Sequence, residues 1–136
     1  MNSIFQKLNI KYENKILVLN IPQEFKNMFN RALKEGAKID EKRMPSSIYT
    51  FALVFVTSID EISVTASMSV KSLVKENPKF WIAFPKSNSR KYKTDIKKDA
   101  DWEVMNAIGF RVDKSTEINE DWIAYRFTRL NKVSVE

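Results

Sequence analysis

The stretch that decides the fold is KILVLN at residues 15–20, followed by IPQEFKNMFNRALKEG at residues 21–36. The first part is a short apolar run, which is typical of a strand buried on both faces of a parallel sheet. In the second part, apolar residues recur at the i, i+3, i+4, i+7 and i+8 spacing of a helix, between Pro22 and Gly36. The sequence therefore predicts a strand followed at once by a helix.

The buried-strand pattern recurs twice downstream. FALVFV at residues 51–56 and FWIAF at residues 80–84 are again continuously apolar, and residues 37–40 could form a short edge strand. Residues 59–74 fit either a strand or a helix. We favour the helix there, because the crossover between two parallel strands usually contains one.

The last third of the chain predicts one more helix and a hairpin. Thr94 or Asp99 could cap the helix, and Gly109 would end it. Two strands, at residues 110–117 and 122–128, are then joined by a turn at residues 118–121. The whole order predicts an α/β fold: a three-layer, mostly parallel doubly wound sheet with a C-terminal antiparallel hairpin. We expect a single domain over residues 1–136, with an ordered core from about residue 12 to residue 130.

Composition excludes several kinds of chemistry. The 136 residues contain no cysteine and no histidine, so Ser–His and Cys–His catalysis and cysteine-ligated metals are impossible. We expect a reducing, cytoplasmic compartment, because neither a disulfide nor a bilayer-spanning apolar run can form. The net charge of +6 permits anionic partners without requiring them.

At the level of individual residues, the chain resembles a family of short bacterial proteins to which no activity is assigned. The matching stretches are KILVLNIP at 15–22, WIAFPKS at 81–87, TD at 94–95, DW at 101–102, GF at 109–110 and DWIAYRF at 121–127. The predicted order of elements also resembles the Rossmann-like fold of class I S-adenosylmethionine-dependent methyltransferases in shortened form. The resemblance implies that fold, and it implies no activity.

The turn after the first strand does not favour a bound adenosyl cofactor. Such a cofactor usually needs a glycine-rich turn there, because glycine lets the backbone approach the ligand and adopt positive φ. Residues 20–25 contain no glycine, and the only two glycines in the chain, Gly36 and Gly109, are predicted to lie at helix ends. Asp40 and Glu41 follow the second strand, where a ribose-binding acid would be expected, but we interpret them as an ordinary polar loop. We therefore expect no cofactor and no metal.

A basic loop follows the third strand and should lie at the carboxyl edge of the sheet, where open α/β folds bind ligands. The hypothesis is an anion or phosphate site in this loop; its candidate residues are Lys86, Ser87, Ser89, Arg90, Lys93 and Thr94. The simpler interpretation is a solvated loop. Tyr92, which lies among the charges, could instead stack on a base of single-stranded nucleic acid.

The remaining candidate functional residues are two acid–tryptophan pairs and one arginine. Asp101–Trp102 and Asp121–Trp122 could suggest catalytic carboxylates, but we interpret the tryptophans as packing anchors. Arg126 lies in an apolar strand, and we expect it to form a structural ion pair with an acid such as Asp95 or Asp121. No residue is assigned a catalytic role.

Three functions follow from these patterns. The first is a non-catalytic interaction or regulatory module on a methyltransferase-like scaffold. The second is an anion-binding or enzymatic domain that uses the loop at residues 85–95, with an anionic small molecule as ligand. The third is single-stranded nucleic-acid binding. The sequence also leaves open a protein partner, including a homodimer formed through the hairpin edge.

Overall fold

The computed structural model describes residues 4–11, 15–42, 44, 47–66, 73, 79–97 and 102–129. Eleven helical and strand elements lie within these residues. In chain order they are α1 (Ile4–Lys7), β1 (Lys15–Leu19), α2 (Gln23–Lys34), β2 (Lys38–Asp40), β3 (Phe51–Phe55), α3 (Ile59–Glu61), the π-helical turn η1 (Ile62–Ala66), β4 (Lys79–Pro85), α5 (Glu103–Ala107), β5 (Phe110–Glu117) and β6 (Trp122–Arg129).

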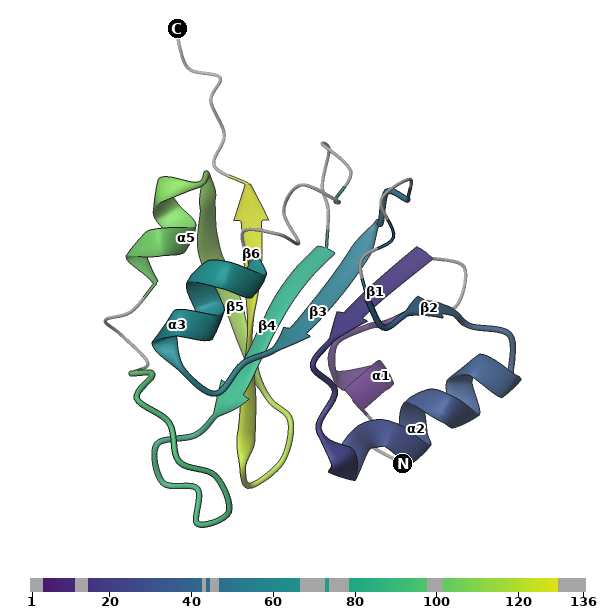
Figure 1. The fold of residues 1–136 in the computed structure, drawn as a ribbon, viewed down its shortest axis with the longest axis horizontal. Coiled ribbons are helices and arrows are strands. Elements are labelled where there is room, and N and C mark those ends of the chain that lie inside the picture. The colour runs from purple at the N-terminus through teal and green to yellow at the C-terminus, as the bar shows by residue number, and fades with distance from the viewer. Residues whose placement is uncertain are drawn as a thin grey trace, which may run out of the picture.

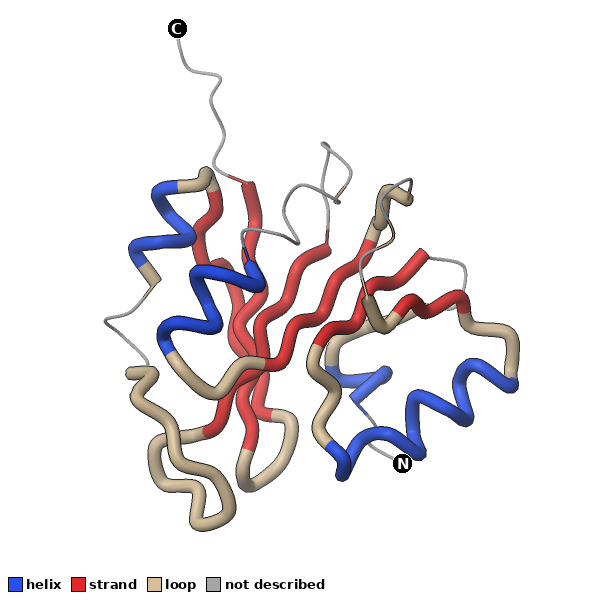
Figure 2. The backbone as a smooth tube through the Cα atoms, in the orientation of Figure 1, coloured by secondary structure: helices blue, strands red, loops and turns tan. Residues whose placement is uncertain are grey.

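One six-stranded sheet organises the molecule (Figure 1, Figure 2), with the strand order β2-β1-β3-β4-β6-β5. The four strands from β2 to β4 are parallel, whereas β6 is antiparallel to both of its neighbours. The chain leaves β1 toward β2 and then returns to the other side of β1 to form β3. The predicted mostly parallel sheet with a C-terminal antiparallel hairpin is confirmed.

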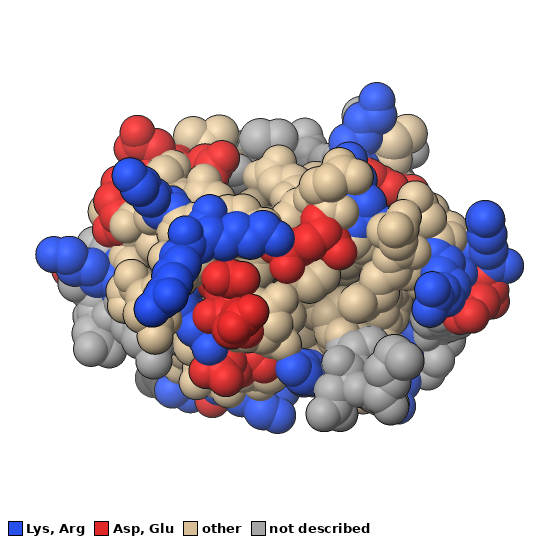
Figure 3. Space-filling model, turned by 90° about the horizontal axis from the view of Figure 1, so that it is seen from below, with Lys and Arg blue, Asp and Glu red and all other residues tan. Residues whose placement is uncertain are grey.

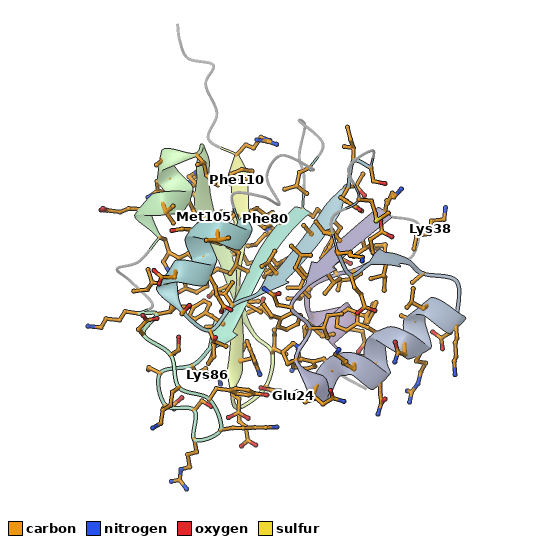
Figure 4. All side chains as sticks on the ribbon, in the orientation of Figure 1. Glu24, Lys38, Phe80, Lys86, Met105 and Phe110 are labelled. Atoms are coloured by element: carbon orange, nitrogen blue, oxygen red, sulfur yellow. The ribbon has the colours of Figure 1, made fainter. Side chains whose placement is uncertain are left out.

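Both faces of the sheet are buried, which explains the continuous apolar runs of its central strands. In β1, Ile16 and Val18 pack in one cluster with the residues of α1 and α2. Their neighbours Leu17 and Leu19 pack in the other cluster, with Ile62 and α5. Because successive side chains of a strand alternate between faces, a strand covered on both sides needs apolar residues throughout. Figure 4 shows Phe80, Met105 and Phe110 close together between α5 and the sheet.

The sequence-based boundaries differ from the structure in three places. The core begins upstream of residue 12, because Ile4 and Leu8 are buried. The helix predicted over residues 59–74 is confirmed from Ile59 to Ala66, but Leu73 forms an isolated parallel bridge with Tyr49, and residues 67–72 and 74 lie outside the described residues. The helix that Thr94 or Asp99 was expected to cap begins at Glu103, whereas residues 94–97 are not helical and the Thr94 hydroxyl donates to the backbone oxygen of Thr57. Asp99 lies outside the described residues.

The two glycines adopt backbone conformations that other residues avoid. Gly36 has φ of 104° after α2, and Gly109 has φ of 92° after α5. Both therefore end helices, as predicted, because glycine reaches positive φ without a steric penalty. No helix within the described parts of the chain has the length and apolar character needed to cross a bilayer.

Candidate functional site

The carboxyl edge of the parallel strands is where open α/β sheets bind ligands, chiefly at the point where consecutive connections run in opposite directions. Here that switch point lies between β1 and β3. The edge is at the bottom of Figure 1 and faces the reader in Figure 3. A hollow of about 220 Å³ opens there, which we name the switch-point pocket. It is lined by Asn20, Pro22, Phe55, Thr57, Glu61, Tyr92 and Trp122.

Asn20 shapes the turn that follows β1. Its φ is 61°, in the left-handed region, where asparagine is tolerated better than most non-glycine residues. The turn therefore keeps a conformation suited to glycine, although no glycine is present. The asparagine also brings a side chain: its Nδ2 donates a hydrogen bond to the backbone oxygen of Phe55 over 3.1 Å. This bond joins the carboxyl ends of β1 and β3 across the switch point.

Glu24 lies in the first turn of α2, and its carboxylate is the centre of a hydrogen-bond cluster. It accepts hydrogen bonds from the Tyr92 hydroxyl and from Trp122 Nε1, the latter over 3.2 Å. Lys91 Nζ lies 3.5 Å from the same carboxylate. A helix N-terminus favours a negative charge, and in nucleotide-binding folds a ligand phosphate supplies it. In this chain the side chain of Glu24 supplies the negative charge.

The electrostatics of this cluster fix its protonation state. Burial alone would raise the pKa of Glu24, but the hydrogen bonds from Tyr92 and Trp122 and the charge of Lys91 outweigh it, so the pKa is lowered. Burial, and then the hydrogen bond to Glu24, raises the pKa of Tyr92. Glu24 is therefore charged and Tyr92 neutral around neutral pH, and neither is suited to exchange protons there.

Trp122 connects this cluster to the core. Its side chain is about 1% exposed. Its ring centroid lies 4.9 Å from that of Tyr92, 5.5 Å from that of Phe55 and 6.3 Å from that of Phe25. These rings come from the basic loop, β3 and α2. The aromatic contacts therefore hold the loop at residues 86–97 against the carboxyl edge of the sheet.

Half of the predicted anion-binding residues are engaged within the protein. The Ser89 hydroxyl donates to Asp121 over 2.8 Å and also accepts hydrogen bonds from the backbone of the loop. Thr94 Oγ1 donates to the backbone oxygen of Thr57 over 2.7 Å. Lys86 forms an ion pair with Glu117. These groups shape the loop and attach it to its neighbours.

The other predicted residues do not converge on one point. Ser87 lines a hollow of about 260 Å³ together with Lys86 and Glu117, whereas Arg90 lines a separate hollow of about 410 Å³ beside Glu120 and Asp121. Lys93 is exposed. Figure 3 shows acidic side chains among the basic ones over this edge, and Figure 4 places Glu24 and Lys86 at the same end of the sheet. The loop is therefore not a uniformly positive surface.

The expected ion pair exists, but the expected partners are wrong. Arg126 Nε lies 2.9 Å from Asp113 Oδ1, and its NH2 group donates to Oδ2 over 3.1 Å. Asp95 instead accepts a hydrogen bond from the backbone of Ile59, and Asp121 accepts one from Ser89. The cause is a register shift between Val112 and Lys114, which leaves Asp113 as an extra residue of β5 beside Arg126.

We expect Arg126→Ala to lower the free energy of unfolding by only about 1 kcal/mol or less. The pair is bidentate, but the Arg126 side chain is 38% exposed, and solvent-exposed pairs contribute little. A double-mutant cycle with Asp113→Asn, measured by urea unfolding, isolates the pair. A coupling of about 3 kcal/mol would mean that the pair is desolvated in solution and would contradict this expectation.

The tryptophans of the two acid–tryptophan pairs belong to different core clusters. Trp102 is 7% exposed and packs against Phe84, Tyr125 and Phe127, with centroid distances of 5.2 to 5.4 Å. The packing interpretation of both tryptophans is therefore confirmed, while Asp101 lies outside the described residues. Asp40, considered above for a ribose, accepts a hydrogen bond from the Tyr49 hydroxyl over 2.6 Å.

Comparison with solved structures finds several methyltransferase-like neighbours. A candidate type 11 methyltransferase from Sulfolobus solfataricus aligns with a TM-score of 0.59 at 13% identity, over 94% of this chain and 92% of that chain. A SAM-dependent methyltransferase from Aquifex aeolicus aligns with a TM-score of 0.53 at 11% identity, over 91% and 87%. The fibrillarin pre-rRNA processing protein of Methanococcus jannaschii has a TM-score of 0.58 at 15% identity, over 90% and 69%.

The chain therefore has the Rossmann-like fold of class I SAM-dependent methyltransferases. Comparison with protein-family models gives no match, and comparison with curated proteins gives none. At these identities the structural likeness establishes the fold alone, so the function has to be argued from the residues of this chain.

Proposed function

We propose that this protein is a non-catalytic binding or regulatory module built on a methyltransferase-like fold. The observation that carries the proposal is that side chains of the protein itself fill the crevice at the switch point. Asn20 bridges the ends of β1 and β3. Glu24, Tyr92 and Trp122 form one hydrogen-bonded cluster beside it. What is left is a pocket of about 220 Å³.

The size of the remaining space supports the proposal. Ligand pockets commonly measure roughly 300–1,000 Å³, so about 220 Å³ is small for a nucleoside cofactor. A larger ligand would have to displace Tyr92 and break its hydrogen bond to Glu24. It would then leave a partly buried carboxylate with fewer donors, which is costly. The crevice is therefore better suited to staying closed around a small group than to admitting a cofactor.

The pKa shifts support the same proposal. General acid–base catalysis needs a group whose pKa lies near the working pH, and enzymes shift pKa values toward neutrality to obtain one. The pKa values of Glu24 and Asp113 are lowered, and those of Tyr49, Tyr92 and Arg126 are raised. All five shifts move away from neutral pH. Burial is the largest cause for the two tyrosines, and hydrogen bonds to charged or polar partners set the direction for Glu24, Asp113 and Arg126, as expected of groups with structural roles.

The two alternatives receive less support. An anion site in the loop at residues 85–95, or a groove for single-stranded nucleic acid, needs an excess of unpaired positive charge. Within the described residues, Arg90 and Lys93 have no ion-pair partner, which favours the anion site. However, Lys86 is paired with Glu117, and Glu120 and Asp121 lie beside Arg90. The local charge is therefore mixed.

We expect neither S-adenosylmethionine nor S-adenosylhomocysteine to raise the melting temperature of the protein. A ligand that binds the folded state stabilises it in proportion to the logarithm of its concentration, so saturable binding would be visible in a thermal-shift titration. Inorganic phosphate and a single-stranded oligonucleotide are tested in parallel thermal-shift titrations. A melting temperature that rises with the logarithm of the concentration of either adenosyl compound would refute the proposal, whereas a salt-sensitive shift with phosphate or oligonucleotide would favour the corresponding alternative.

A further inference from the structure

The switch-point pocket places three aromatic rings around one small space. Phe55, Tyr92 and Trp122 all line it. The Trp122 ring is inclined by 85° to Phe55 and by 62° to Tyr92. Trp122 and Phe55 are only 1% and 2% exposed, so the half-buried Tyr92 is the ring with the most accessible surface in the pocket wall. The face of an aromatic ring carries partial negative charge and attracts cations. Rings around a small space are the usual basis for recognising organic cations in water.

Glu61 adds a formal negative charge to the same pocket. Its Oε1 accepts hydrogen bonds from Thr57, over 2.6 Å from the backbone nitrogen and 3.0 Å from the hydroxyl. These bonds fix the carboxylate at the pocket wall. Among the described residues, Glu61 has no cationic partner and the pocket is lined by neither lysine nor arginine. Within the described residues the pocket wall therefore carries the Glu61 charge, while Lys91, which contacts the Tyr92 ring, is paired with Glu24.

The neighbouring lysine shows that one of these rings can take a cation. Lys91 Nζ lies 5.6 Å from the centroid of Tyr92, within the range of a cation–π contact. The same nitrogen lies 3.5 Å from Glu24. Lys91 is outside the residues that line the switch-point pocket, so it does not occupy it. The Tyr92 ring therefore accepts an ammonium contact where a carboxylate lies nearby, and Glu61 places a second carboxylate at the pocket.

We propose that the switch-point pocket binds a small alkylammonium ion, a cation of the size of choline or tetramethylammonium. This rests on the proposed function, because only a crevice closed to a cofactor leaves a pocket of this size and composition. An anion would be repelled by Glu61. A neutral ligand of the same shape would gain the contact with the rings but no electrostatic attraction, so charge decides which ligand is preferred.

The experiment compares a cation with its uncharged isostere on the full chain. Choline and tetramethylammonium are titrated by isothermal calorimetry, beside 3,3-dimethylbutan-1-ol, in which a carbon replaces the choline nitrogen. We expect dissociation constants of roughly 0.1 to several mM for the cations, as suits ligands of so few atoms. The neutral alcohol should bind about tenfold more weakly. Equal binding of choline and the alcohol, or no binding of either cation, would overturn the proposal.

Matched variants locate the site. Glu61→Gln keeps the shape and an acceptor for Thr57 but removes the charge, and we expect it to weaken choline binding about threefold to tenfold. Asp60→Asn removes one charge from the preceding, exposed residue and should leave binding unchanged. Tyr92→Phe and Tyr92→Leu both lose the hydroxyl, but only leucine loses the ring. If choline binds more weakly only to Tyr92→Leu, the result supports the π contact. If both Tyr92 variants weaken choline binding equally, the result contradicts it.

Adding S-adenosylhomocysteine separates this proposal from the one on which it rests. Binding of that compound would refute the non-catalytic role, whatever choline does. If neither it nor the cations bind, the closed crevice stands and the ammonium site is wrong. Melting curves of each variant, followed by circular dichroism, confirm that the titrated protein is folded.

Discussion

Trp122→Ala should lower the free energy of unfolding by about 3–5 kcal/mol, the largest effect that we expect from a single substitution near the site. The side chain is 1% exposed, and it contacts rings from β3, α2 and the basic loop. Truncation removes these contacts, leaves a cavity, and deprives Glu24 of one donor. For a chain of this size the melting temperature should fall by roughly 10 °C or more. Urea unfolding measures the free energy and a thermal melt measures the melting temperature, both followed by circular dichroism.

The control for this substitution is Trp122→Phe. It keeps an aromatic ring among Phe25, Phe55 and Tyr92 but removes the Nε1 donor to Glu24. We expect a loss of about 1–2 kcal/mol, from one hydrogen bond to a charged group and a smaller ring. If the alanine variant lost less than about 1 kcal/mol, the aromatic cluster would not hold the loop in solution, and the account of a closed crevice would be wrong.

The parts of the fold that sequence predicted are those set by local periodicity. The run at residues 15–19 is apolar on both faces because helices cover both faces of the sheet. The stripe of α2 has helical spacing because one side of that helix packs on the sheet. Such patterns can be recognised from neighbouring residues alone. The handedness of crossovers limits the possible strand orders without selecting one, so the order β2-β1-β3-β4-β6-β5 comes from the structure.

The parts that sequence missed depend on contacts between distant segments. Thr94 was a candidate helix cap, since a threonine before apolar residues has that signature. Its hydroxyl instead donates to Thr57, 37 residues earlier in the chain. The partner of Arg126 was missed because the bulge at Asp113 changes which acid lies opposite. A bulge of one residue leaves no regular signal in the surrounding alternation.

The candidate site also depends on contacts between distant segments, which the sequence does not show. Glu24 is the most connected carboxylate at the carboxyl edge, yet in the sequence it is only an acid in the first turn of a helix. That position favours a negative charge and says nothing about its partners. Tyr92 drew attention as a ring among lysines, suited to stack on a base. The structure turns its hydroxyl toward Glu24 and packs its ring on Trp122. The sequence shows which hydrogen bonds a polar side chain is able to form, but the fold determines which partners it has.

The turn that follows β1 shows why the absence of a glycine does not by itself change the fold. Asn20 adopts the left-handed backbone conformation that is usual for glycine, and β1 still leads directly into α2. Unlike glycine, Asn20 has a side chain, which occupies room beside the turn and donates a hydrogen bond to the backbone oxygen of Phe55. Backbone geometry and room for a ligand are therefore separable properties of this turn. The proposed function uses this separation, because there the fold persists while side chains of the protein occupy the crevice.

Glu24→Gln should lower the free energy of unfolding by about 1–3 kcal/mol at pH 7. The substitution leaves a hydrogen-bonding group of the same shape but removes the charge that the Tyr92 hydroxyl, Trp122 Nε1 and Lys91 all face. Hydrogen bonds to a charged acceptor are worth more than those to a neutral one, and the α2 N-terminus loses its favourable charge. Glu120→Gln, which removes an exposed acid from the same edge, is the matched control and should change stability by less than about 0.5 kcal/mol.

The pH dependence of this difference tests its electrostatic origin. Because the folded-state pKa of Glu24 lies below the ordinary value of 4.5, the unfolded chain binds more protons at that position as the pH falls. The contribution of Glu24 is therefore fully present above about pH 4.5 and is lost as the pH drops through the lower, folded-state pKa. Urea unfolding between pH 7 and pH 3 should show the wild-type protein and Glu24→Gln converging in stability. A gap that stays constant down to pH 3 would mean that shape, and not charge, makes Glu24 the centre of the cluster.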